Sequence, residues 1–128
     1  MAIESVRSIS MTPIAGAIAQ RVFVVLAAGA EVTTAGAGVD VLGVTLEASP
    51  ASDQKSIPVT CMDGSRQEVV AGAAIDVSAG VVAIMSNASG QAVAATSTNA
   101  IVGYAVTSAG AAGQVIEFLA TKAANVAA

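Results

Sequence analysis

The sequence predicts an all-β protein, a small β-barrel or sandwich built from two similar tandem β modules with little or no helix. First, apolar residues alternate with a period of two much more often than they recur at the spacing of a helix. Second, clusters of Gly, Asn, Asp, Ser and Pro separate the alternating runs, as a meandering β chain requires. Third, VLGVTLEAS at residues 41–49 returns as IVGYAVTSA at residues 101–109.

Individual strands are predicted from this alternation. In IPVTC (57–61), Ile57, Val59 and Cys61 point to one side of a strand, and QVIEFLA (114–120) alternates in the same way. Further short candidates are residues 21–26, 41–46, 68–71, 81–85, 91–95 and 101–106.

Turns and helices are predicted from glycine. Asp63-Gly64 in MDGS favours a two-residue hairpin turn, because glycine accepts a positive φ. Alanine-rich pieces such as AGAIAQR are interrupted by glycine too closely for a stable helix. Any helix would be one short turn or the last residues, TKAANVAA.

The two halves of the chain align over most of their length. Gly43 and Gly103 lie 60 positions apart (103 − 43 = 60), and this alignment also brings residues 56–61 over 115–120, with one residue fewer in the loop between. Upstream, residues 22–35 fall roughly over 82–96 with one residue inserted. Phe118 then aligns with Val59 and is expected in the core. Chance similarity in a sequence rich in Ala, Val and Gly is the alternative, and the β-rich prediction holds with either.

The repeat divides the chain near the Asp63-Gly64 turn. We expect an N-terminal arm at residues 1–13, a first β module at 14–62, a second β module at 63–122 and a C-terminal tail at 123–128, within one compact domain. Gly43 and Gly103 are candidate structural glycines. A glycine inside a strand commonly marks a bulge, a sharp bend or a close backbone approach, although an edge strand can simply tolerate one.

The composition favours a role in protein–protein contact over ligand binding or catalysis. Hydrophobic residues make up 55% of the chain but aromatic residues only 2%, so its small side chains offer little area for a ligand pocket. Charged residues are 11%, well below the usual quarter, and a weakly charged surface tends to associate. The net charge of −4 with five basic residues argues against nucleic-acid binding. These values predict an assembly component.

Membrane and secretion signals are not found in the sequence. The mean hydropathy of +0.76 is high, but Gly, Ser, Asn and Thr interrupt the uncharged residues 77–116, so no window of about 20 predominantly apolar residues exists. The start, MAIESVRSISM, places an acid near a base and has no apolar h-region. Cys61 is the one cysteine and cannot form an internal disulfide. We expect a soluble protein made in a reducing cell interior.

No catalytic, cofactor-binding or metal-binding residues are predicted, and the chain is not expected to be an enzyme. Without histidine there is no Ser-His-Asp or Cys-His arrangement, and the commonest transition-metal ligand is missing. Cys61 alternates with core residues, the nine carboxylates are spread singly, and neither GAGVDVLG nor AGAAGQ has phosphate-binding spacing. Tyr104 is expected in the core or at a rim rather than in a ligand site.

Several segments together resemble a known family. GVTLEAS after AGAGVDV, then SIPVTCMDGSRQEVVAGAAIDVSAG and SGQAVAATSTNAIVGYAVTSAGAAGQVIEFL, are similar to the repeated pattern of the decoration, or cement, proteins of tailed-bacteriophage capsids. The resemblance runs from about residue 8 to 120. It implies a structural virion protein, made in the host cytoplasm, that sits on the outer face of the head, often as homotrimers. Its partner would be the major capsid protein, whose neighbouring copies it clamps, and it has no catalytic residues to carry over.

The N-terminal arm is the candidate interface with the capsid or with a neighbouring subunit. MAIESVRSISMTP alternates weakly and ends at a proline, so we expect an arm that is loose in the free protein and adds as a strand to a partner. An ordinary frayed terminus is the alternative. The candidate interface residues are Ile3, Val6, Arg7, Ile9 and Met11.

Two other functions fit the composition. A β-sandwich module that binds carbohydrate or a receptor on a phage or bacterial surface structure is the alternative function, but such sites usually present aromatic platforms, and the chain has no Trp and one Tyr. The second alternative function is that of another self-assembling β subunit, from a tail or a shell.

Overall fold

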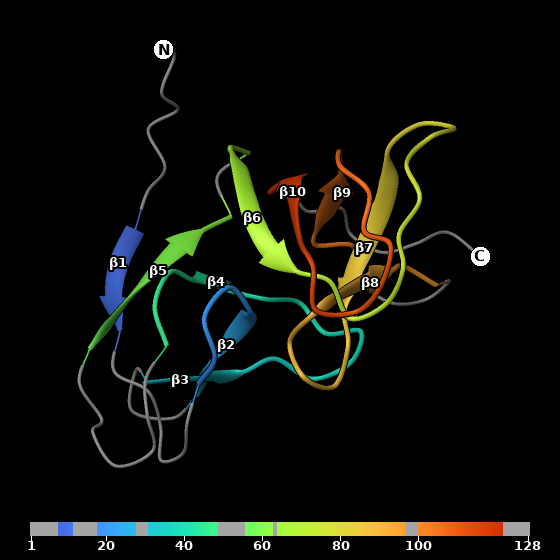
Figure 1. Ribbon diagram of the computed structural model, residues 1–128. Coiled ribbons are helices and arrows are strands. Elements are labelled where there is room, and N and C mark those ends of the chain that lie inside the picture. Colours follow the sequence, from blue (N-terminus) through green and yellow to red (C-terminus); the bar gives the residue numbers. More distant parts are fainter. Residues whose placement is uncertain are drawn as a thin grey trace.

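The protein is an all-β molecule, as predicted. The structure is a computed structural model that describes residues 8–11, 18–27, 31–48, 56–62, 64–96 and 100–121. Within these residues ten strands form two five-stranded sheets, and every pair of neighbouring strands in a sheet is antiparallel (Figure 1). These residues include no helix, and of the TKAANVAA segment only Thr121 lies among them.

Both sheets have the same strand order. The first sheet runs β1 (Ser8–Met11), β5 (Ile57–Cys61), β4 (Gly43–Thr45), β2 (Phe23–Ala27) and β3 (Glu31–Thr34). The second runs β6 (Arg66–Val70), β10 (Val115–Leu119), β9 (Gly103–Ala105), β7 (Val82–Ser86) and β8 (Ala92–Ala94). Each strand of the first sheet therefore has a counterpart five strands later in the second.

The register repeats as well as the order. Val24 pairs with Gly43 in the first sheet, and Ile84 pairs with Gly103, both 60 positions later, in the second. Equivalent strands in the two sheets therefore pair at equivalent residues, and the chain consists of two tandem β modules.

One detail of the predicted repeat alignment and one predicted turn are wrong. The pairs Val24↔Thr34 and Ile84↔Ala94 keep the offset at 60 through the first hairpin of each module, so no residue is inserted there. The MDGS segment is not a hairpin, because β5 pairs with β1 and β4 while β6 pairs with β10. Gly64 has the expected positive φ of 86°, but its turn leads from one sheet to the next.

The second sheet curls into a small barrel. A parallel bridge between Ala71 and Ala92 joins the end of β6 to β8, so the two edges of this sheet meet. Ile75 and Ala109 form a second bridge between the loops that follow β6 and β9, and both residues are buried in the core. Closure leaves the alternate side chains of each strand inside the barrel and the others outside.

Each module has its own apolar core. Buried members of the first core are Ile18, Val22, Val24, Val32, Ile57 and Val59. The second core contains the counterparts of four of them, Ile84, Ala92, Ile116 and Phe118. Ile57, Val59 and Phe118 were predicted as core residues and are fully buried, whereas Cys61 is half-buried.

The modules are joined because the first contributes side chains to the second core. Phe23, Ala35, Val41 and Val44 belong to the second core although they lie in the first module. The Phe23 ring meets the Phe118 ring edge to face, with 5.7 Å between centroids and 82° between planes. Aromatic pairs favour this geometry. The first module therefore contributes directly to the core of the second module.

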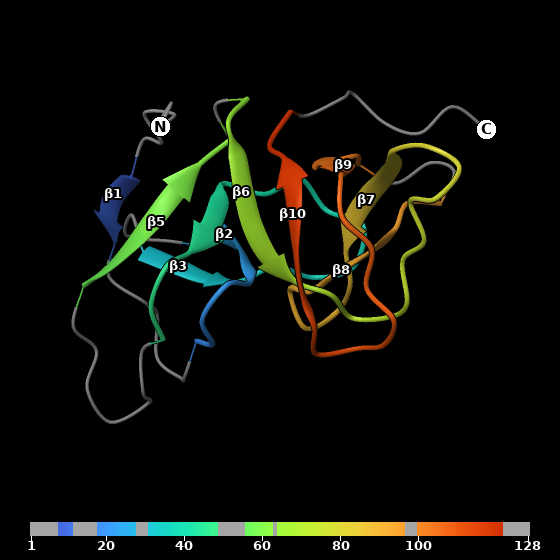
Figure 2. The same ribbon diagram turned by 45° about the horizontal axis from the view of Figure 1, so that its top comes forward.

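Backbone bonds at Arg21 also connect the modules. Arg21 N–H donates to Thr45 O (2.9 Å) within the first module, and Arg21 O accepts from Val70 N–H (2.9 Å) in β6. Arg21 adopts a φ of 57°, which is uncommon for a residue with a side chain. Its Nε lies 3.0 Å from Glu68 Oε1. The position of β6 between β5 and β10 is visible in both ribbon views (Figures 1 and 2).

Candidate interaction surface

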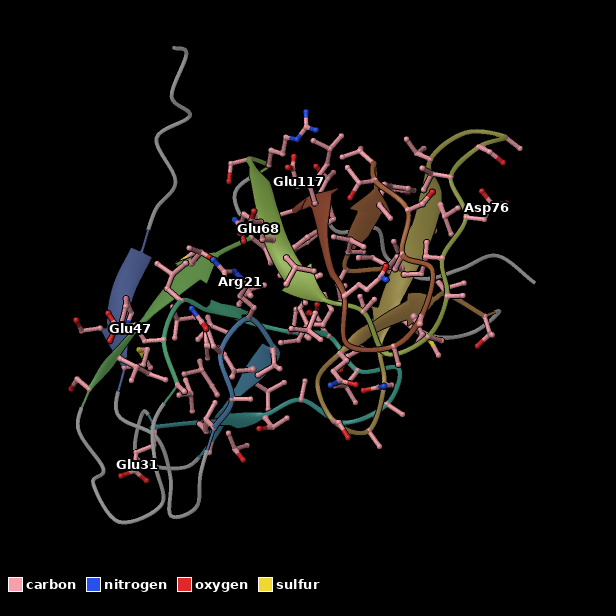
Figure 3. All side chains as sticks on the ribbon, viewed as in Figure 1. Arg21, Glu31, Glu47, Glu68, Asp76 and Glu117 are labelled. Carbon is pink, nitrogen blue, oxygen red and sulfur yellow. The ribbon has the colours of Figure 1, made fainter. Side chains whose placement is uncertain are left out.

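The described residues form no candidate metal site. Those residues contain no group of three or more His, Cys, Asp or Glu that could hold a metal ion. Figure 3 shows Glu31 and Glu47 on the first module, Asp76 at the far side of the second, and Glu68 and Glu117 near β6 and β10. Glu68 and Glu117 stand opposite each other on β6 and β10, and each forms an ion pair with an arginine.

Buried polar side chains are paired with one another at the module junction. Thr60 Oγ1 donates to Gln67 Oε1 (2.8 Å), and Gln67 Nε2 donates to Cys61 O (2.7 Å). No buried side-chain nitrogen or oxygen among the described residues lacks a hydrogen-bond partner. None of these atoms is therefore left aimed at a missing ligand.

One carboxyl group is perturbed by a turn. Ser78 N–H donates to Asp76 Oδ1 (2.9 Å), and this bond, together with one from the Ser78 side chain, lowers the pKa of Asp76 below its ordinary value of 3.8. A hydrogen bond that favours the charged form shifts the pKa downward. Because the pKa is depressed in the folded state, this bond stabilises the fold fully above pH 3.8, and its contribution is lost as the pH falls through the folded pKa.

We expect the Asp76 carboxyl carbon to titrate in an NMR series with a midpoint below 3.8. In Ser78→Ala the midpoint should move upward, because the hydroxyl bond is removed while the N–H bond stays. A midpoint at or above the ordinary value in the unsubstituted protein would contradict the turn geometry.

The structure describes only part of the predicted N-terminal interface. Ser8–Met11 forms β1, which pairs with β5 of its own chain over four residues, Ser8↔Thr60 to Met11↔Ile57. Met11 packs against the first core. Ile9 lies in the same strand, and Ile3, Val6 and Arg7 lie outside the described residues. Residues 8–11 therefore differ from the expectation of an arm loose in the free protein: β1 is the first module's counterpart of β6.

The two candidate strand glycines begin equivalent strands, Gly43 in β4 and Gly103 in β9. A Cβ placed on Gly43 would lie 1.9 Å from Thr60 O, and one on Gly103 would lie 2.3 Å from Leu119 O. Both distances are far inside van der Waals contact. The neighbouring strand passes through the space that a side chain would fill, in both modules.

Equivalent side chains on the outer faces of the modules have different surroundings. Two rows of three residues cross neighbouring strands at the same register. The junction row of the first module is Thr60, Val44 and Phe23. The outer row of the second module is Leu119, Tyr104 and Ala83.

The junction row is fully covered and the outer row is not. All three residues of the junction row are buried at the boundary with the second module. In the outer row, Leu119 is 38% exposed, and Tyr104 and Ala83 are half-buried. Sequence reasoning placed Tyr104 in the core or at a rim but did not identify the row. The repeat alignment places Tyr104 at the position equivalent to Val44, and this correspondence could have identified the row.

Charges beside the outer row are paired within the chain. Arg66 Nε forms an ion pair with Glu117 Oε1, and Arg21 pairs with Glu68. All four side chains are partly exposed, so each pair contributes little stability. Together they leave this side of the second barrel with two positive and two negative charges.

The fold is similar to that of a known phage protein. The chain is similar to the head fiber gp8.5 N base of bacteriophage phi29, with a TM-score of 0.72 and 19% identity, over 90% of this chain and 95% of that chain. At this identity the likeness shows the fold alone. No family model and no curated protein matches the chain. The resemblance to capsid cement proteins therefore stays a prediction.

No described segment forms a helix long and apolar enough to cross a membrane.

Proposed function

We propose that this protein is a structural component of a phage virion that attaches to the outer surface of the head. The observation that carries the proposal is the fold, which matches a protein described as the base of a head fiber over nearly the whole of both chains. The finer proposal is that the protein cements neighbouring copies of the major capsid protein, as the resemblance of its sequence implies.

The surface chemistry supports a role in contact. Charged residues are 11% of the chain, and within its described residues no metal-binding cluster is found. Exposed leucine and valine side chains occur on both modules, including Leu26, Val39 and Leu46 on the first. Weakly charged surfaces with apolar side chains suit broad contacts between proteins.

The test is a binding experiment with purified protein and capsids that lack it. We expect saturable binding at a fixed number of copies per capsid, measured by co-sedimentation, with density on the outer surface in electron cryo-microscopy. If the protein also cements the shell, the thermal midpoint of the capsid should rise on binding, because a ligand of the intact state stabilises it. Binding without a rise in the thermal midpoint would support attachment to the head and contradict the cementing role. No binding would overturn both proposals.

The N-terminal residues provide a second part of the test. We propose that the residues before β1, which include Ile3, Val6 and Arg7, contribute to binding, and that residues 8–11 must be kept because they form β1. Deletion of residues 1–7 is expected to weaken capsid binding without changing the thermal midpoint of the free protein. Unchanged binding would remove this segment from the interface.

A further inference from the structure

Charge is distributed unevenly over the molecule. The five basic and nine acidic residues of the chain all lie outside residues 77–116. This stretch contains β7, β8 and β9, which are neighbours in the second sheet, and the loops that follow them. In both ribbon views β7 and β9 lie on the side of the molecule farthest from β1 (Figures 1 and 2). We call the surface of residues 77–96 and 100–116 the uncharged face.

The exposed side chains of the uncharged face are apolar or neutral. Val81, at 61%, is the most exposed of the large hydrophobic residues in the described part of the chain, and Val115 is 47% exposed. The other exposed residues of the face are alanine, glycine, serine, threonine and one glutamine, Gln114. Burial of such a surface removes apolar area from water without removing water from a charge.

Internal hydrogen bonds hold the longest loop of the uncharged face, which joins β9 to β10. Ile75 and Ala109 exchange two backbone bonds of 2.9 and 2.8 Å, and both residues are buried. Gln114 Oε1 accepts from Gly110 N–H (2.7 Å). The loop is therefore fixed before any partner binds, so little free energy is lost in ordering it.

The chemistry of the uncharged face argues against several kinds of partner. Nucleic acid requires cations, and residues 77–116 contain none. Carbohydrate sites usually present aromatic platforms, and Tyr104, the single aromatic residue of the stretch, is half-buried. The face instead has the composition of the core of a protein–protein interface, where charged residues are depleted.

We propose that the uncharged face is the surface by which this protein attaches to the phage head, packed against an equally uncharged area of the shell protein. The inference rests on the proposed function, which requires one surface for attachment. The remaining described surface carries the charged side chains. Figure 3 shows Glu31 and Glu47 on the first module, Glu68 and Glu117 near β6 and β10, and Asp76 at the border of the uncharged face. Burial of those charges in a contact would cost desolvation free energy that the uncharged face does not require.

The test is co-sedimentation with capsids that lack the protein, repeated over a range of salt concentrations and with charged variants. The dissociation constant should change less than about threefold between about 50 mM and about 500 mM NaCl, because no charge takes part in the contact. Val81→Glu and Val81→Lys should each weaken binding by about tenfold or more, because a charge of either sign must be desolvated.

The control variants are Leu26→Glu and Leu26→Lys, since Leu26 is 58% exposed on the first module and lies outside the uncharged face. They should leave capsid binding unchanged, and circular dichroism checks that all four variants keep the fold. A photocrosslinking residue, benzoylphenylalanine, in place of Val81 should form a covalent link to the shell protein of decorated capsids. The same residue in place of Leu26 should not.

The outcomes separate this proposal from the proposed function. Capsid binding that both Val81 variants leave unchanged overturns the role of the uncharged face, while attachment to the head stands. Weakening by one sign of charge only, or loss of binding at high salt, shows an ionic contact and also overturns it. So does a crosslink from position 81 to another copy of this chain instead of the shell protein. No capsid binding by the unsubstituted protein overturns both proposals.

Discussion

Replacing Gly43 or Gly103 with alanine is expected to lower the free energy of unfolding by at least about 1–3 kcal/mol. The added Cβ would lie 1.9 Å from Thr60 O in the first module and 2.3 Å from Leu119 O in the second. Both obstacles are backbone atoms of a paired strand, which cannot rotate away as a side-chain end can. The ladder between β4 and β5, or between β9 and β10, must separate, and overpacking of this kind costs at least about 1–3 kcal/mol.

The measurement is urea unfolding followed by circular dichroism, with Gly36→Ala as the matched control. Gly36 has no atom within 4 Å of its ideal Cβ position, so alanine there meets no obstacle. We expect the control to be neutral or stabilising by up to about 1 kcal/mol, since alanine reduces the entropy of the unfolded chain. Losses below about 1 kcal/mol in both Gly43→Ala and Gly103→Ala would show that the strands can move apart at little cost.

Phe23→Ala is expected to lower the free energy of unfolding by about 3–5 kcal/mol, the range for a buried phenylalanine. Phe23 is fully buried, and its ring packs edge to face on Phe118. Because Phe23 comes from the first module and its contacts belong to the second core, the cavity would form where the two modules join. A change of this size is a large fraction of the stability of a typical domain, about 5–15 kcal/mol.

The same unfolding experiment, combined with amide hydrogen exchange, tests the consequence for the junction. Protection should fall in both modules of Phe23→Ala, and Phe23→Ala and Phe118→Ala should be non-additive in a double-mutant cycle because the two rings touch. Leu26→Ala on the same strand is the control, since Leu26 is 58% exposed and should change stability by less than about 0.5 kcal/mol. A fall confined to the first module would show that the modules fold independently.

Local pattern was sufficient for most of the strands. The alternation in IPVTC and QVIEFLA predicted β5 and β10, and side chains at every second position of a strand share one face. The recurrence of Gly43 at Gly103 predicted the tandem modules and identified β4 and β9 as equivalent strands. The weakly alternating Ser8–Met11 was assigned to an arm because no local signal distinguishes a terminal strand with a partner from one without.

The sequence by itself determined a β-rich chain of two similar halves, since alternation and glycine spacing are local properties that any compact structure must satisfy. The tertiary structure decided which strands pair and which faces are covered. The MDGS turn could not reveal that β6 pairs with β10, 45 or more residues away, because that pairing depends on closure of the whole second sheet. Nor could the repeat reveal that Val44 is buried while its counterpart Tyr104 is partly open. Equivalent positions have equal local geometry, but burial depends on what packs over them.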